Sequence, residues 1–412
     1  MSKRNSILII SAIAIIVIGG LLFFYFSSDD KTATQITTST TNPFGGIPGD
    51  REVGQGPETG IVSDTTSQTV GVDRLTKLYR NPTSGSVFFV NKNNQNVLRF
   101  VDRAVGNIYE YILDIEGGGV QRVTNITIPK IQEVVWSNTG NDLILRYLEG
   151  DTDNISSFSA KLKSGTGSTD SLAELTGIFL SQNIKQLVIN PLGDKVFGIF
   201  DKSDKSGTYG FIGNLTASDK KTIFESPISY FNISWPKENI ISFTTKPNYK
   251  DEGLLYFFNT RDYSFDRVLG GIVGLSAVIN KDADLVAYSY SVTGGFYLDI
   301  YDTVNKIGSG LRIPTLADKC VWGNKNAKVL YCSIPKTIPG DNYPDAWYQG
   351  LQSFSDDIWK INFETGEMYE LYNISLNEGD IDAFDLKISR DDKYLSFSNK
   401  NDLSLWLLRL GQ

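Results

Sequence analysis

The chain has 412 residues, of which 41% are hydrophobic, and its 39 basic and 47 acidic side chains give a net charge of −8. This length suits one large globular domain or two smaller ones, and the negative charge argues against binding nucleic acid, which needs a basic surface. The sequence contains no histidine and two cysteines. These counts exclude histidine-dependent nucleophiles, histidine-ligated metals, structural zinc sites and iron–sulfur clusters, so we expect no cofactor and no metal site.

Residues 7–26 form an uncharged apolar segment, ILIISAIAIIVIGGLLFFYF. As a helix this segment would span about 30 Å, the thickness of the hydrocarbon core of a bilayer. Two basic residues precede it and two aspartates follow it, so the positive-inside rule places residues 1–6 in the cytoplasm and the remainder outside. We therefore predict a single-pass anchor in the cell membrane. The alternative is a cleaved signal peptide, but the segment ends in large residues rather than a small-residue cleavage site.

Residues 27–68 are rich in Ser, Thr, Gly and Pro and contain few large apolar side chains. Such a segment cannot bury enough surface to offset the entropy of ordering, so we predict a disordered linker that holds the following domain away from the membrane.

Residues 69–412 are predicted to be a repeat of short strands, with no helical period. Each copy has an apolar residue, a short polar turn and a strand, and clear copies are WSNTGNDLIL from Trp136, INPLGDKVFGIF from Ile189 and ISRDDKYLSF from Ile388. A weaker copy, RNPTSGSVFFV from Arg80, is interpreted as the first. The strands after the turns begin at residues 87, 143, 196, 240, 285, 329 and 394.

Four antiparallel strands per unit and a length of about 49 residues per unit predict a seven-bladed β-propeller, with six or eight blades as alternatives. The last unit stops at Leu410, after its third strand. The segment 69–75, TVGVDRL, resembles a fourth strand, so we expect it to pair beside residues 405–410 and close the ring.

The units, close to W-S-x-x-G-x-x-L-x-F followed by I-Y-x-x-D-x-x-x-G, resemble the WD40-like repeats of TolB-type bacterial propellers. The resemblance implies the propeller fold and does not imply a Tol–Pal function. Residues 347–367, WYQGLQSFSDDIWKINFETGE, also resemble membrane-anchored propellers of unassigned role from small-genome bacteria, which adds no activity.

Cys320 and Cys332 flank the turn of the sixth unit. A hairpin centred near Asn326 would place them opposite each other on adjacent strands, so an exported domain favours a disulfide. The alternative is a pair of small buried thiols.

The longest insertion, residues 335–357, contains aromatic and acidic side chains that suit recognition of a peptide, a sugar or a cation. It would emerge on the same face as the loops 91–105 and 149–156, which makes that face the candidate binding surface. The alternative is that the aromatic side chains pack against their own blade. The candidate binding residues are Tyr343, Trp347, Tyr348, Phe354, Asp341 and Asp345.

Other acidic groups are assigned to solvated turns rather than calcium loops because they lack the glycine and glutamate of an EF-hand. They are the aspartates Asp151, Asp153, Asp201 and Asp204, together with the neutral oxygen donor Asn154.

Two classes of function remain. We favour a non-catalytic scaffold that binds a protein or an envelope polymer outside the cytoplasm, because no catalytic constellation is found. The alternative is a carboxylate-based enzyme acting on an extracellular carbohydrate. Two carboxylates about 5–10 Å apart and facing the central channel would favour the enzyme.

Overall fold

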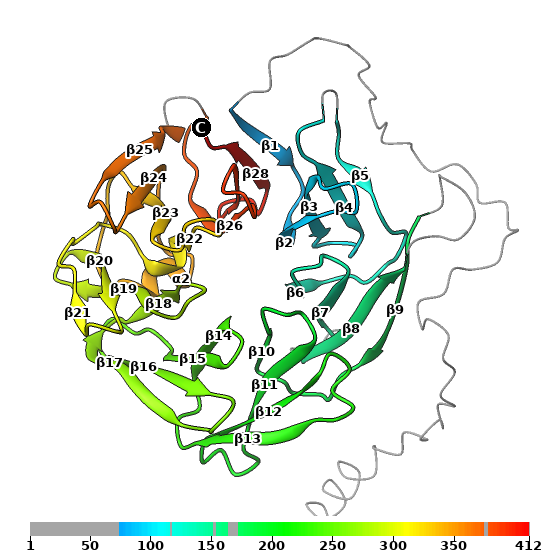
Figure 1. Ribbon diagram of the computed structural model, residues 1–412, viewed down its shortest axis with the longest axis horizontal. Helices are drawn as coiled ribbons and strands as arrows, with labels where there is room; N and C mark the ends of the chain where they lie inside the picture. Colours follow the sequence, from blue (N-terminus) through cyan, green and yellow to red (C-terminus); the bar gives the residue numbers. More distant parts are fainter. Residues whose placement is uncertain (1–73, 116–117, 151–153, 164–171, 375–377, 412) are drawn as a thin grey trace, which may run out of the picture. The chain divides into compact units, whose positions relative to one another are not determined.

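The computed structural model describes residues 74–115, 118–150, 154–163, 172–374 and 378–411, which form seven four-stranded sheets around a central axis (Figure 1). This confirms the predicted seven-bladed propeller. The predicted N-terminus, anchor and linker (residues 1–68) lie outside the described residues. In the part of the chain that is described, no helix is long and apolar enough to cross a membrane.

The blades follow one another along the chain, and the strands of each blade are named from the axis outward. Blades 1 to 3 contain β2 (Thr83–Val90), β3 (Asn96–Asp102), β4 (Ile108–Ile112), β5 (Gln121–Arg122); β6 (Ile131–Trp136), β7 (Asp142–Leu148), β8 (Ile155–Lys163), β9 (Glu174–Phe179); and β10 (Gln186–Ile189), β11 (Lys195–Asp201), β12 (Thr208–Asn214), β13 (Lys221–Ser226). Blades 4 and 5 contain β14 (Phe231–Lys237), β15 (Ile240–Thr245), β16 (Glu252–Asn259), β17 (Phe265–Val273); and β18 (Ser276–Ile279), β19 (Leu285–Val292), β20 (Gly295–Asp302), β21 (Ile307–Gly308). Blades 6 and 7 contain β22 (Cys320–Trp322), β23 (Val329–Pro335), β24 (Asp356–Asn362), β25 (Met368–Tyr372); and β26 (Ala383–Ile388), β27 (Tyr394–Asn399), β28 (Leu405–Arg409), β1 (Leu75–Tyr79). A 3₁₀ turn, η1 (Ala317–Lys319), precedes β22, and a short helix, α2 (Asp345–Tyr348), lies between β23 and β24.

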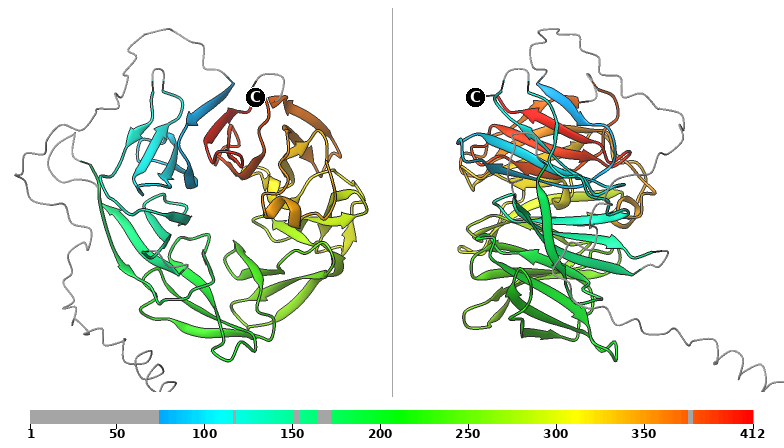
Figure 2. Two further views of the ribbon diagram at one scale, coloured as in Figure 1. Left: turned by 180° about the vertical axis from the view of Figure 1, so that it is seen from behind. Right: turned by 90° about the vertical axis from the view of Figure 1, so that its right-hand side faces the viewer.

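The ring is closed by the first described strand, which supplies the outer strand of the last blade (Figures 1 and 2). In this pairing Leu75 lies opposite Leu408, and the Lys77 ammonium is 2.9 Å from the carboxylate of Asp402. The prediction of closure is therefore confirmed, although the strand begins at Leu75 instead of ending there. Residues 69–73 lie outside the described part of the chain.

Apolar side chains fill every interface between neighbouring blades. Seven clusters of buried residues are each built from two adjacent blades, and together they cover the seven interfaces. Because both faces of a blade are covered in this way, second strands such as β7 (DLILRYL) and β23 (VLYCSIP) are apolar along most of their length.

The repeated polar turn joins the first and second strands of a blade. In five blades its fourth residue has a positive φ, as in Gly140 (68°) and Gly193 (78°), which explains the glycine of the repeat. The side-chain oxygen of the first residue of this turn accepts hydrogen bonds from backbone N–H groups later in the turn or just after it, as Asn190 Oδ1 does from Lys195 N at 2.8 Å.

The predicted position of the first repeat is wrong. Val87 lies in the innermost strand β2, so the turn that corresponds to the other blades is at residues 91–95, and the following strand is β3. The predicted loop 91–105 is therefore mostly this turn and β3. The error has a physical source. The strand β2 contains a bulge between Thr83 and Ser86, and the bulge places a glycine, Gly85 with a φ of 132°, inside the strand. A glycine among polar residues is also the sequence pattern of a turn.

Candidate functional site

The insertion of blade 6 is a strap, defined as residues 335–357, that runs from β23 to β24 across one end of the ring. It carries α2 and reaches three blades beyond its own. Three hydrogen bonds make these connections, from Tyr249 N to Asp345 Oδ2 (2.7 Å) in blade 4, from Ser291 Oγ to Tyr343 O (2.5 Å) in blade 5, and between Ser353 Oγ and Asn401 Oδ1 (2.6 Å) in blade 7. The strap is thus fastened to blades 4, 5, 6 and 7.

Three of the four aromatic residues predicted to bind a partner belong to the strap and are buried on its inner side. Tyr343, Trp347 and Phe354 are 1%, 3% and 3% exposed, and they pack with Phe296 of blade 5 in a small core of their own. The Tyr343 and Phe296 rings meet edge to face with centroids 5.0 Å apart. This placement corrects the expectation of an exposed aromatic rim, because burial of large apolar area outweighs exposure at this position.

The other candidate residues are at least partly exposed. Tyr348 is 37% exposed, and its hydroxyl donates to Asp318 Oδ2 at 2.7 Å. Burial of that hydroxyl and the Asp318 carboxylate raise the pKa of Tyr348 well above its usual value. Asp341 is exposed, and Asp345 is half-buried with its carboxylate on the backbone of Tyr249.

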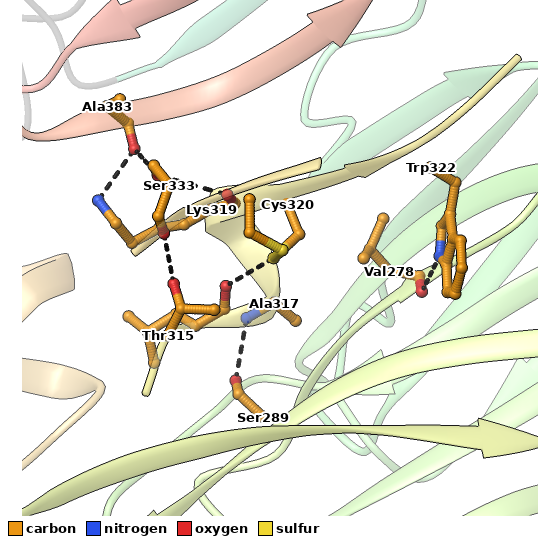
Figure 3. Close-up of a disulfide and its surroundings, with 11 residues drawn as sticks. Val278, Ser289, Thr315, Ala317, Lys319, Cys320, Trp322, Ser333 and Ala383 are labelled. Atoms are coloured by element: carbon orange, nitrogen blue, oxygen red, sulfur yellow. Dashed lines mark hydrogen bonds between the residues drawn. A yellow bond between two sulfur atoms is a disulfide. The ribbon is translucent and has the colours of Figure 1, made fainter. Parts of the chain in front are cut away.

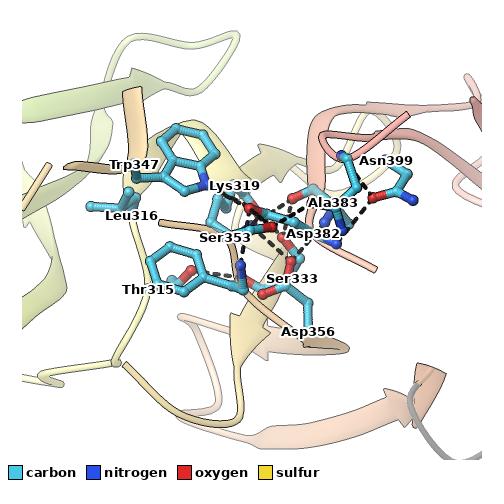
Figure 4. Close-up of polar contacts among 12 residues, drawn as sticks. Thr315, Leu316, Lys319, Ser333, Trp347, Ser353, Asp356, Asp382, Ala383 and Asn399 are labelled. Atoms are coloured by element: carbon cyan, nitrogen blue, oxygen red, sulfur yellow. Dashed lines mark hydrogen bonds and ion pairs between the residues drawn. The ribbon is translucent and has the colours of Figure 1, made fainter. Parts of the chain in front are cut away.

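A buried charge cluster holds the base of the strap (Figure 4). The Lys319 ammonium is fully buried and lies 2.5 Å from Asp382 Oδ1 and 2.7 Å from Asp356 Oδ2. Asp382 Oδ2 also accepts hydrogen bonds from Trp347 Nε1 at 2.9 Å and from the backbone N–H of Phe354 at 3.1 Å. These contacts join the first turn of blade 6, the strap and the start of blade 7.

The cluster contains one more carboxylate than ammonium. Asp356 Oδ1 is buried with no hydrogen-bond partner among the described residues. Burial raises the pKa of Asp356 to about 6, against the opposing attraction of Lys319. Sequence reasoning missed Lys319 and Asp382 because neither belongs to a repeat or motif and they are 63 residues apart.

The disulfide predicted from the hairpin is present in the structure. Cys320 and Cys332 are bonded, with their Cα atoms 4.1 Å apart, and they lie directly opposite each other on β22 and β23 (Figure 3). Both cysteines are buried, and Cys320 directly follows Lys319. The bridge therefore lies next to the charge cluster and fixes β22, which directly follows the turn that carries Lys319.

The innermost strands enclose a central cavity of about 850 Å³, which has Trp347 and Tyr348 in its wall. A second compartment of about 420 Å³ lies toward blades 3 to 5, and Asp318 and Tyr348 line both. The charged residues around the larger cavity are Arg103, Glu133, Asp318, Asp385, Lys387 and Lys400.

The carboxylates of this cavity are engaged within the protein. Glu133 is 2.6 Å from Arg146, and Asp385 is 2.7 Å from Lys387. Asp356 and Asp382 lie close together through Lys319, but both are fully buried. The described part of the chain contains no group of three or more acidic or cysteine side chains placed to hold a metal ion.

The remaining predicted positions lie elsewhere. Residues 149–156 do connect the second and third strands of blade 2, but Asp151 and Asp153 lie outside the described residues, and Asn154 is exposed at the start of β8. Asp201 is ion-paired with Lys185 at 2.8 Å. Asp204 is in an exposed turn, where hydrogen bonds from Ser206 lower its pKa.

Comparisons with known proteins agree on the fold. No protein-family model and no curated protein matches the sequence. Among solved structures, tricorn protease is 10% identical with a TM-score of 0.50, covering 81% of this chain and 33% of that one, so the match spans about a third of that protein. An oligogalacturonate lyase in complex with manganese is 12% identical (TM-score 0.48, 80% of this chain, 97% of that chain). TolB from Acinetobacter baumannii is 12% identical (TM-score 0.40, 74% of this chain, 60% of that chain).

The chain is a seven-bladed β-propeller. At these identities the similarity concerns the fold alone, because one propeller fold serves many functions.

Proposed function

We propose that this protein is a non-catalytic binding scaffold that docks a protein or an envelope polymer on the strap-bearing end of the propeller. The observation that carries the proposal is the strap itself. Its inner side is held by hydrogen bonds to blades 4, 5 and 7 and by its own strands in blade 6, while its outer side stays exposed. Leu351 on this element is 70% exposed. A preorganised surface lowers the entropy cost of binding a partner.

We further propose that residues 7–26 anchor the chain in the cell membrane, with residues 1–6 in the cytoplasm and the propeller outside. The charge distribution around the apolar segment supports this orientation. The disulfide is a second support, since such bonds persist mainly in oxidising compartments.

The enzymatic alternative, hydrolysis of an extracellular carbohydrate by paired carboxylates, has no supporting observation among the described residues. The carboxylates that line the cavity are bonded to Arg146, Lys387 and Tyr348. We therefore propose the scaffold as the single function.

Site-specific photo-cross-linking in cells that produce the full chain tests the proposal. A photoreactive amino acid replaces Leu351 on the strap, and the matched control replaces Leu192, which is 63% exposed in the turn between β10 and β11 at the opposite end of the ring. We expect a discrete cross-linked protein, or a polymer-sized adduct, from position 351 and not from position 192. Equal cross-linking from both positions, or none from position 351, contradicts the proposal.

A further inference from the structure

The charges around the central cavity are not all balanced within the protein. Of its three carboxylates, Glu133 is ion-paired with Arg146 and Asp385 with Lys387, while Asp318 accepts a hydrogen bond from the neutral Tyr348 hydroxyl. Lys400 and Arg103 are different, because no carboxylate of the described residues contacts either one. The Lys400 ammonium lies 5.2 Å from the centre of the Trp347 ring, and Arg103 Nη2 donates to the neutral Gln132 Oε1 at 2.7 Å.

The two cations belong to neighbouring loops. Lys400 lies in the turn between β27 and β28 of blade 7, and Arg103 follows β3 in blade 1. The segment before β2 joins these loops through backbone hydrogen bonds, since Thr83 N donates to Leu403 O and Arg103 N donates to Pro82 O, each at 2.9 Å. Both side chains line the same cavity, on the side away from blades 4 and 5.

Lys400 is half-buried, and its desolvation lowers its pKa, while the attraction of the Asp382 carboxylate opposes this shift only in part. The nearest buried carboxylate, that of Asp382, is already bonded to Lys319, Trp347 and the strap backbone. Because Lys400 makes no direct ion pair, an anion from outside the chain would offset the desolvation cost that Asp382 leaves.

We infer that Lys400 and Arg103 form an anion-binding site in the cavity wall, which takes a carboxylate or a phosphate group of the ligand. The inference rests on the proposed function, because it places this group on the end of the ring where the partner docks. Lys400 supplies a point charge beside the Trp347 ring, and Arg103 supplies a planar set of donors that suits either anion.

Titration calorimetry of the full-length protein at low ionic strength tests the site, with succinate and inorganic phosphate as separate probes. We expect saturable binding of at least one probe with one site per chain, and the preferred probe identifies the anion. Lys400→Met and Arg103→Met should each weaken that binding about tenfold or more, as expected for a charged hydrogen bond. Lys400→Arg should keep affinity within about threefold.

Lys246→Met is the matched control, because Lys246 is exposed on the corresponding loop of blade 4 and does not line the cavity. It should bind as the wild type does. Absence of saturable binding by the wild type, or equal affinity in the wild type and in both methionine variants, overturns the inference. Should Lys400→Met unfold, Arg103→Met decides alone. Cross-linking from position 351 does not depend on these probes, so a failure of the anion site is distinguishable from a failure of the scaffold proposal.

Discussion

Lys319 shows why single buried charges matter more in this protein than its many surface pairs. Its ammonium neutralises part of the charge of two fully buried carboxylates, Asp356 and Asp382. Lys319→Met should lower the free energy of unfolding by about 3–5 kcal/mol, because it leaves both carboxylates buried without a counter-ion. Urea denaturation measures this loss. Lys336→Met, which removes a partly exposed lysine paired with Asp357, should cost below about 1 kcal/mol. Equal losses in the two variants would contradict the role of the cluster.

Asp356 predicts an unusual dependence of stability on pH. Its pKa is raised to about 6 in the folded protein, so the folded state binds this proton more tightly than the unfolded state does. The ionised carboxyl therefore lowers the free energy of unfolding above pH 6, and most of this cost disappears as the pH falls toward 4. Relative to Asp356→Asn, the wild type should gain about 2 kcal/mol between pH 7 and pH 4. Urea titrations of both proteins across this range measure the difference, and a constant difference would refute the assignment.

Among the elements, the hairpin of β22 and β23 is fixed by its disulfide. The bridge closes a loop with a sequence separation of 12, for which the chain-entropy model gives about 3 kcal/mol. The double variant Cys320→Ala, Cys332→Ala should therefore unfold at lower urea with a loss near this value. Chemical denaturation measures it, with the untouched wild type under non-reducing conditions as the reference. A loss below about 1 kcal/mol would show that the packing of β22 alone fixes the hairpin.

The closing strand β1 offers a second test at this scale. Leu75 is 2% exposed in the core between blades 6 and 7 and pairs with Leu408. Leu75→Asp should detach β1 because an unpaired carboxylate would be buried, and the amide hydrogens of β28 should then exchange faster. Thr76→Asp places the same charge at the next, exposed position and should leave this exchange unchanged. Unchanged exchange in Leu75→Asp would mean that the closure does not protect β28.

Local patterns predicted the elements, and long-range contacts decided the site. The polar turn before Leu143 and the alternation of apolar residues identified the blades, and the missing fourth strand after Leu410 predicted the closure. The first blade was misread because the bulge at Gly85 imitates a turn. The burial of Trp347 could not be predicted from the sequence, because the aspartate that accepts the hydrogen bond from its indole N–H is 35 residues away in another blade.

At the scale of the whole molecule, the ring is a series of equivalent interfaces with one addition. Each of the seven interfaces has its own apolar core, so no blade is held by a special contact of that kind. The strap adds an eighth core at one end and makes the two ends of the channel different. That asymmetry supports the proposal that a partner binds at the strap-bearing end.

The proposed membrane location rests on residues 7–26, and two measurements test it. Deletion of this segment should move the protein from the carbonate-washed membrane fraction to the soluble fraction, because about 20 apolar residues are needed to span a bilayer. Deletion of residues 30–49, an equal length of the linker, should leave it in the membrane. Intact-mass analysis of the purified wild type should show a chain that still contains residues 7–26. A mature chain that begins after Phe26 would instead establish a cleaved signal peptide and rule out the anchor.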